Sequence, residues 1–291
     1  MSDYIYQIYD RIFKKILTLS SIAVINLING LFKTDYSTDS TITYNWTEHV
    51  GENLRTCLAD TILTINGKHS YHLEAQMTED ENIVLRVFEY GFGHARKNVR
   101  EDPITSLTLH FPEPKVILLF SDEKAPDEYL LNLDFGTQGT FLYKVTTFKY
   151  LDTTPEELTN KKMIILIPFE LLKLRRIIEK KRTPETLDAL KHLIFHDIIG
   201  AIQKNEEAGN ITVDDARKLR GLTHRLYRHI YSHYEELEEI NEMTDESLLL
   251  DIEIVEKKRE QELSAKDEII ATKDSEIAAL KAEIERLKNN K

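Results

Sequence analysis

The sequence predicts a mixed α/β fold that continues into a helical region and ends in a coiled coil. Apolar residues at helical spacing open the chain, short alternating or β-branched runs follow, and helical spacing returns near residue 170. At 291 residues the chain buries enough surface to fold without disulfides. We expect an α/β domain at 1–170, a helical region at 171–244 and a coiled-coil tail at 245–291.

The first part alternates between helical and strand-like segments. Helices are expected at 5–17, 21–32 and 81–98, from the recurrence of apolar residues every three or four positions. Strand-like runs are expected at 42–50, 58–65, 70–76, 115–120, 141–150 and 163–167. This order indicates a mixed sheet, one side of which the first two helices cover.

Helix starts and a heptad pattern organise the rest of the chain. Three helix starts carry capping patterns: Thr154 with Pro155 and Glu157, Thr183 with Pro184, and Thr212 with Asp215. In the tail, apolar residues follow a heptad at Leu263, Ile270, Ile277, Leu280, Ile284 and Leu287. Lys266 and Lys273 occupy the core positions of the earlier heptads, so only the end of the seam is strongly apolar. We expect a homo-oligomer through this coiled coil.

Composition restricts the compartment and the kinds of site. A single cysteine, Cys57, excludes an internal disulfide and a thiolate metal cage. The start of the chain lacks the apolar stretch of a signal peptide, and the most apolar early run, 22–32, is shorter than the roughly 20 residues of a membrane span. We expect a cytoplasmic protein without a membrane segment.

The net charge of −12 is unevenly distributed. Residues 1–170 carry 16 basic and 24 acidic side chains (−8), residues 171–234 carry 13 and 8 (+5), and residues 235–291 carry 9 and 18 (−9). Two basic stretches account for the positive segment: Lys173, Arg175, Arg176, Lys180, Lys181 and Arg182, then Arg217, Lys218, Arg220, Arg225 and Arg228. They indicate either a DNA contact or a solvated helix face that pairs with the acidic tail, and the salt dependence of binding distinguishes the two.

Two acidic residues lie on strands joined by Asn66-Gly67, a strong hairpin signal. Asp60 belongs to the first strand and Glu74 to the second, where alternation places Glu74 and Gln76 on one face together with His72. Two inward-facing carboxylates repel each other unless they share a cation. Oxygen ligands suit Mg²⁺ or Mn²⁺, which activate water and stabilise charge on a phosphodiester.

Strand register decides whether Asp60 and Glu74 share an ion. A two-residue Asn66-Gly67 loop pairs Ile65 with Lys68 and leaves the two carboxylates on opposite faces. A shared ion requires a loop of odd length, such as Asn66-Gly67-Lys68 with a bulge, or a bulge within the strands.

Four segments occur in order along the chain: Tyr9-Asp10-Arg11-Ile12-Phe13-Lys14, Arg55 to Asp60, Tyr71 to Gln76, and Arg86 to Tyr90. Together they resemble the Rpn family of recombination-promoting nucleases and transposases. The resemblance implies a restriction-endonuclease-like fold of the PD-(D/E)XK type, with Asp60, Glu74 and the backbone carbonyl of Ala75 around a metal ion. Gln76 stands where that superfamily usually has lysine, so it can bind the attacking water without supplying charge.

Other polar residues are expected to support this site or to be structural. Arg86, Tyr90 and Lys97 lie on one stripe of the helix at 81–98 and are expected to face the active centre or the DNA backbone. Asp10 and Lys14 form a helical i, i+4 pair, primarily structural, that could also buttress the site. The structural alternative makes Asp60 a turn cap and Glu74 a residue of a solvated strand face. His224, His229 and His233 have a spacing that fits zinc, but neither acid nor cysteine completes a ligand set.

The sequence leads to the hypothesis of a Mg²⁺-dependent DNA endonuclease linked by resemblance to recombination or transposition. Asp60, Glu74 and Gln76 are the expected catalytic residues, and DNA is the expected partner. A second hypothesis is a DNA-binding or assembly module that keeps the fold without the reaction and gains avidity from its coiled coil. A third is a protein-binding scaffold, suggested by the acidic tail.

Overall fold

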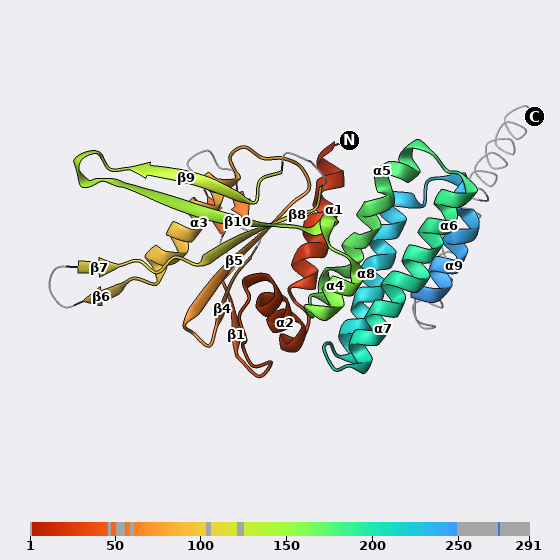
Figure 1. The fold of residues 1–291 in the computed structure, drawn as a ribbon, viewed down its shortest axis with the longest axis horizontal. Coiled ribbons are helices and arrows are strands. Elements are labelled where there is room, and N and C mark those ends of the chain that lie inside the picture. The colour runs from red at the N-terminus through yellow and green to blue at the C-terminus, as the bar shows by residue number, and fades with distance from the viewer. Residues whose placement is uncertain are drawn as a thin grey trace, which may run out of the picture.

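The computed structural model describes residues 2–45, 48–50, 56–58, 61–102, 106–120 and 125–248, together with Lys273. Asp60 and the expected coiled-coil tail beyond residue 248 lie outside the described residues, except for Lys273, which is helical. The described chain is an α/β protein with a six-stranded mixed sheet and a helical C-terminal region (Figure 1).

Two N-terminal helices stand between the sheet and the helical region (Figure 1). Helices α1 (Ser2–Ile16) and α2 (Ser21–Phe32) confirm the two helices predicted there. The Ser20 side chain caps α2 by accepting a hydrogen bond from the Ala23 amide. Among the described residues no single helix is long and apolar enough to span a membrane, and only Ile8–Ile16 with Ser21–Phe32 pass that test jointly, as a pair bent by 105°.

The six-stranded sheet mixes antiparallel and parallel pairs. Its strands follow one another in space as β1 (Ile42–Asn45), β4 (Thr61–Ile65), β5 (His69–Gln76), β8 (Glu113–Leu118), β10 (Thr140–Lys149) and β9 (Glu128–Asp134). Strand β4 is antiparallel to both β1 and β5, β8 is parallel to both β5 and β10, and β9 is the antiparallel edge. Helix α3 (Ile83–Lys97) lies in the connection from β5 to the parallel strand β8 and confirms the third predicted helix.

Each face of the sheet buries a different set of apolar residues. Tyr71 and Leu73 of β5 belong to the core that contains α1 and α2, and the Tyr71 ring lies 4.5 Å from that of Phe32. Val116 and Leu118 of β8 belong to the core formed with α3. The two N-terminal helices therefore cover one face, as predicted, and α3 covers the other.

The hairpin between β4 and β5 has an odd-numbered loop. Ile65 pairs with His69 and Thr61 with Leu73, so three residues, Asn66, Gly67 and Lys68, connect the strands. Asn66 and Gly67 both adopt positive φ, 52° and 65°, as the two central residues of a type I′ turn do. The Lys68 amide still donates to the Ile65 carbonyl (3.0 Å), so Lys68 is the extra, bulged residue. The hairpin therefore has the odd-numbered loop that a shared ion requires.

Several strands differ from the predicted runs. The runs at 42–50 and 58–65 each divide into two strands: β1 is followed by β2 (Glu48–Val50), and β4 is preceded by β3 (Thr56–Leu58). Strands β2 and β3 pair with each other, as do β6 (Arg100–Asp102) and β7 (Ser106–Thr108). The edge strand β9 was not predicted. It forms a hairpin with β10 across η1 (Gly136–Gln138), and this hairpin extends beyond the rest of the sheet (Figure 1).

The predicted strand at 163–167 is wrong. This segment belongs to η3 (Ile164–Leu171), a 3₁₀ helix whose eight residues are all buried. A short run that is apolar on every side has no periodicity to distinguish a buried strand from a buried helix. It follows η2 (Tyr150–Asp152) and α4 (Pro155–Asn160), whose predicted capping box at Thr154 is confirmed.

The helical region surrounds η3. It consists of α5 (Leu172–Lys180), α6 (Pro184–His192), the π-helix η4 (Leu193–Ile198), α7 (Ile199–Glu207), α8 (Val213–Tyr231), η5 (Glu235–Leu237) and α9 (Glu238–Leu248). The predicted helix starts at Thr183 and Thr212 are confirmed. Helix α8 contacts η3, α7, α9 and α1, and one apolar core runs from α1 and α2 into this region.

We expect Gly30→Ala to destabilise the protein. An added Cβ at Gly30 in α2 would collide with the Met163 side chain and approach the Lys161 carbonyl to 2.8 Å. Overpacking of this kind costs about 1–3 kcal/mol in the free energy of unfolding, measured by urea denaturation. Gly200→Ala in α7 is the matched control: it meets nothing within 4 Å and should stabilise by about 0.5–1 kcal/mol. Equal effects of the two substitutions would contradict the close contact at Gly30.

Candidate active site

Glu74 is a buried carboxylate in a central strand. It is 3% exposed on β5, with β4 on one side and β8 on the other. Burial of a carboxylate is costly unless a cation or hydrogen bonds compensate it. The Arg86 guanidinium, from the first turns of α3, places Nη2 2.6 Å from Glu74 Oε1. This ion pair therefore links strand β5 to helix α3.

Arg86 holds two carboxylates together. Its Nη1 lies 3.0 Å from Oδ2 of Asp80, in the turn before α3. Burial lowers the pKa of Arg86, but the charges of Glu74 and Asp80 outweigh that effect and raise it above its ordinary value. The guanidinium thus keeps its positive charge beside Glu74.

Gln76 and His72 share the face of β5 that carries Glu74, as alternation predicts. Gln76 Nε2 donates a hydrogen bond of 3.2 Å to Glu74 Oε1. His72 is 1% exposed, and its Nε2 lies 3.8 Å from Glu74 Oε2. Among the described residues, neither ring nitrogen of His72 has a hydrogen-bond partner. A buried polar group without a hydrogen bond costs about 1–3 kcal/mol in the free energy of unfolding, so His72 is an unfavourable residue for stability at this position.

Aromatic and basic groups of α3 surround His72. The Tyr90 ring is buried and meets the His72 ring edge to face, with centroids 6.0 Å apart. Burial lowers the pKa of His94, and the nearby His72 and Lys97 lower it further. Lys97 itself is exposed at the end of α3. Its backbone lies about 16 Å along the helix from Arg86, at a rise of 1.5 Å per residue. Tyr90 therefore lies beside the candidate site, and Lys97 at the far end of its helix.

The remaining expected residues have separate places. The Ala75 side chain packs on the α1 and α2 side of the sheet, opposite to Glu74. Asp10 and Lys14 form the predicted ion pair on α1, with 2.9 Å between Nζ and Oδ2. Helix α1 packs against α8 and η3, which favours the structural reading of that pair. Asp60 is outside the described residues, so Glu74, Gln76 and Arg86 form the part of the predicted site that the structure brings together.

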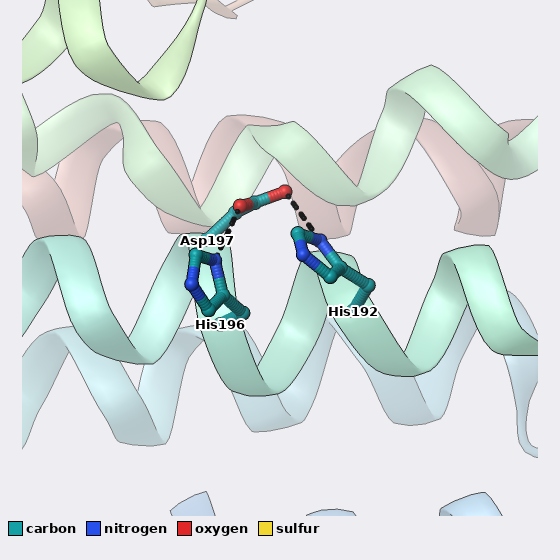
Figure 2. Close-up of side chains that lie close together, drawn as sticks. All are labelled: His192, His196 and Asp197. Atoms are coloured by element: carbon teal, nitrogen blue, oxygen red, sulfur yellow. Dashed lines mark hydrogen bonds and ion pairs between the residues drawn. The ribbon is translucent and has the colours of Figure 1, made fainter.

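His224, His229 and His233, whose spacing alone fits zinc, do not come together in the structure. His224 pairs with Asp245 at 2.5 Å, His229 packs on the Tyr9 ring and His233 on the Tyr234 ring. These three therefore have separate partners. Figure 2 shows another group, His192, His196 and Asp197, whose side chains converge on the surface of α6 and η4.

Many cations of the two basic stretches, 173–182 and 217–228, form ion pairs. At least five of their eleven cations bind acidic side chains: Lys173 with Glu170, Arg175 with Glu179, Arg182 with Glu236, and both Arg217 and Lys218 with Asp214. Four of these pairs lie near the surface, where ion pairs stabilise a fold only slightly but partly neutralise the positive face. The fifth joins Lys173 to the buried Glu170. For Arg175, Arg182, Arg217 and Lys218 the structure favours a solvated, internally paired helix surface over a DNA contact.

No family model, curated protein or solved structure matches this chain. The case for a function therefore depends on Glu74 and the side chains around it.

Proposed function

We propose that this protein is a metal-dependent DNA endonuclease of the PD-(D/E)XK type, with Asp60 and Glu74 as ligands of one Mg²⁺ or Mn²⁺ ion. The register of the β4–β5 hairpin supports this proposal most strongly. The pairing of Thr61 with Leu73 fixes which residues lie opposite each other in the two strands.

 If the same register continues one position further, Glu74 of β5 is opposite Asp60, which precedes β4 and lies outside the described residues. Residues directly opposite in an antiparallel pair point to the same face, so this register suits a shared ion.

The donor set fits a hard divalent cation. Two carboxylates and the Ala75 carbonyl, which the family resemblance adds, are the oxygen ligands that Mg²⁺ and Mn²⁺ prefer. Bound there, such an ion polarises a phosphodiester and lowers the pKa of a bound water. Oε1 of Glu74 already accepts from Arg86 and Gln76, while Oε2 faces His72.

The chain's own residues have distinct roles in this proposal. Gln76 orients the attacking water through its amide, because it is neutral and can both donate and accept. Arg86 contributes the positive charge that lysine supplies elsewhere in the superfamily. Its geometry fits this role because it contacts Glu74 at 2.6 Å while Asp80 holds its other terminal nitrogen. Tyr90 packs behind His72 and keeps water from that side of the site.

One observation favours a second candidate function, a DNA-binding or assembly protein without catalytic turnover. The chain of contacts from Asp80 through Arg86 to Glu74 compensates the buried carboxylate without any metal ion. A nuclease-like site that has lost its reaction would retain such a network for stability. The expected coiled coil at 245–291 would then provide assembly, and the proposed link to recombination or transposition would concern DNA binding alone.

Cleavage of supercoiled plasmid DNA by the full chain tests the proposed function. We expect nicked and linear products with Mg²⁺ or Mn²⁺ and none with EDTA. Asp60→Asn should remove this activity, since an amide is a poor ligand for a hard cation. DNA binding without metal-dependent products would support the second candidate, and cleavage that persists in EDTA would contradict the metal mechanism.

A further inference from the structure

Three potential metal ligands converge on one surface of the helical region. His192 ends α6, and His196 and Asp197 lie in η4. Oδ1 of Asp197 lies 3.1 Å from Nδ1 of His196, and Oδ2 lies 3.4 Å from Nδ1 of His192. The two imidazole rings stack with their centroids 4.5 Å apart. Figure 2 shows the carboxylate of Asp197 spanning the edges of the two rings, with one contact to each.

The π-helix is what brings Asp197 to this cluster. In an α-helix, residues advance by about 100° each, so Asp197 would lie about 140° around the axis from His192. In η4 each backbone hydrogen bond joins residues five positions apart, as between the Ile199 amide and the Ile194 carbonyl. Residues five apart are then roughly one turn apart and nearer to the same face than in an α-helix. Such π-helical turns are rare and occur frequently at functional sites.

Apolar spacing explains why the helix widens at this point. Buried residues recur every four positions at Leu190, Ile194, Ile198 and Ile202. In an α-helix each step of four rotates the apolar side by about 40°, and the wider π turn offsets this drift. The core thus stabilises the turn, while its solvent side carries His192, His196 and Asp197.

We propose that His192, His196 and Asp197 bind a divalent transition-metal ion of the Zn²⁺ type. Two imidazole nitrogens and one carboxylate oxygen, with a fourth position open to water, form an established Zn²⁺ ligand set. Ligands about 2.1 Å from a tetrahedral ion are separated by about 3.4 Å. The separations of 3.1 and 3.4 Å involve different oxygens of Asp197, and one ligand atom from each residue lies within 4.8 Å of the other two, so the three side chains must draw closer together around an ion. This ion differs from that of the proposed nuclease site, because imidazole donors favour Zn²⁺ over Mg²⁺.

Access and charge both suit a cation here. The side chains of His192 and His196 are 63% and 77% exposed, so an ion reaches them directly from solvent. Asp197 also lies near Glu170, a buried carboxylate that pairs with Lys173 at 2.8 Å. Burial raises the pKa of Glu170, and the negative charge of Asp197 contributes to that rise. A bound cation would offset the negative charges of Asp197 and Glu170, and would connect the end of α6 to the π turn η4 that follows it.

Titration of the full chain with Zn²⁺ by calorimetry, in excess Mg²⁺, tests this site. We expect one Zn²⁺ per chain, and a melting temperature that rises with Zn²⁺ concentration because the ion binds the folded state. His192→Ala with His196→Ala should weaken binding by more than the roughly 10–100-fold effect of outer-shell substitutions. Asp197→Asn should weaken it by a smaller factor.

The matched control replaces two other exposed histidines, His110→Ala with His233→Ala, and should leave Zn²⁺ binding unchanged. Glu74→Gln should also leave it unchanged, which separates this site from the proposed nuclease ion. Circular dichroism of each variant verifies folding. Equal Zn²⁺ affinity and stoichiometry in the wild type and the His192 and His196 double variant would overturn the proposal, as would loss of Zn²⁺ binding in Glu74→Gln alone.

Discussion

Glu74→Gln should abolish Mg²⁺-dependent DNA cleavage, lowering the rate at least about 100-fold, while leaving the fold intact. Glutamine has nearly the same volume and keeps a carbonyl oxygen that can accept from Arg86. It removes the negative charge that a hard cation requires of its ligand. Arg86 still pairs with Asp80 in the variant, so its charge remains compensated. Plasmid nicking rates and urea denaturation of the same preparations measure the two effects separately.

Glu89→Gln is the control for this prediction. Glu89 is exposed on α3, three positions from Arg86, so the substitution removes one carboxylate charge without touching the candidate site. Its cleavage rate should match that of the wild type. Full activity in Glu74→Gln would exclude Glu74 as a metal ligand. A comparable loss in both variants would show that the net charge of α3 and β5, rather than the site, controls the rate.

Asp215→Ala should cause the largest loss of stability, about 3 kcal/mol in the free energy of unfolding. The Asp215 carboxylate is 1% exposed and joins the ends of two helices. It accepts from the Ser20 amide at 2.8 Å, from the Ser20 hydroxyl, and from the Thr212 amide at 3.0 Å. Removing it uncaps α8, frees the Ser20 cap of α2 and leaves buried amides unpaired. Urea denaturation measures the loss.

Asp214→Ala is the matched control, because the neighbouring Asp214 is exposed and binds only surface cations, Arg217 and Lys218, in the contacts described. It should destabilise far less than Asp215→Ala. Similar losses in the two variants would show that helix charge, rather than the buried hydrogen bonds, accounts for the effect.

The contribution of Asp215 should also depend on pH. Burial raises the pKa of Asp215, but hydrogen bonds from Ser20 and Thr212 outweigh this and hold the pKa below its ordinary value. Because the folded pKa is depressed, the stabilisation is complete above the unfolded pKa of about 3.9 and is lost as the pH falls through the folded pKa. The stability difference between wild type and Asp215→Ala should therefore be constant near neutral pH and shrink below about pH 4.

Local periodicity was enough to predict much of the fold. The alternation of β5 correctly separated Glu74 and Gln76 from Tyr71 and Leu73, and the capping residues located the starts of α4, α6 and α8. The register of the hairpin between β4 and β5 was not predictable from the sequence, because Asn66-Gly67 is compatible with loops of two or three residues. The η3 segment was mistaken for a strand because a fully buried apolar run carries no periodic signal.

The contact partners of a side chain were harder to predict than the face of the strand or helix on which it lies. The stripe on α3 indicated that Arg86 would face the predicted site, and Arg86 does contact Glu74, but no local pattern identified Asp80 as its second partner. Strand alternation placed His72 on the same face as Glu74. The sequence did not single it out, because a lone histidine on a buried face is more often structural. The group of His192, His196 and Asp197 was hidden, because an α-helix would separate the first and last of these residues and no sequence signal marked the π turn.

Binding of Mn²⁺, measured by electron paramagnetic resonance on the full chain, tests most directly whether Asp60 and Glu74 share one ion. We expect one bound Mn²⁺ per wild-type chain, lost in Asp60→Asn and lost independently in Glu74→Gln. The His192 and His196 double variant should retain it. Mn²⁺ binding of unchanged stoichiometry and affinity in either carboxylate variant would contradict a shared ion and, with it, the proposed nuclease centre.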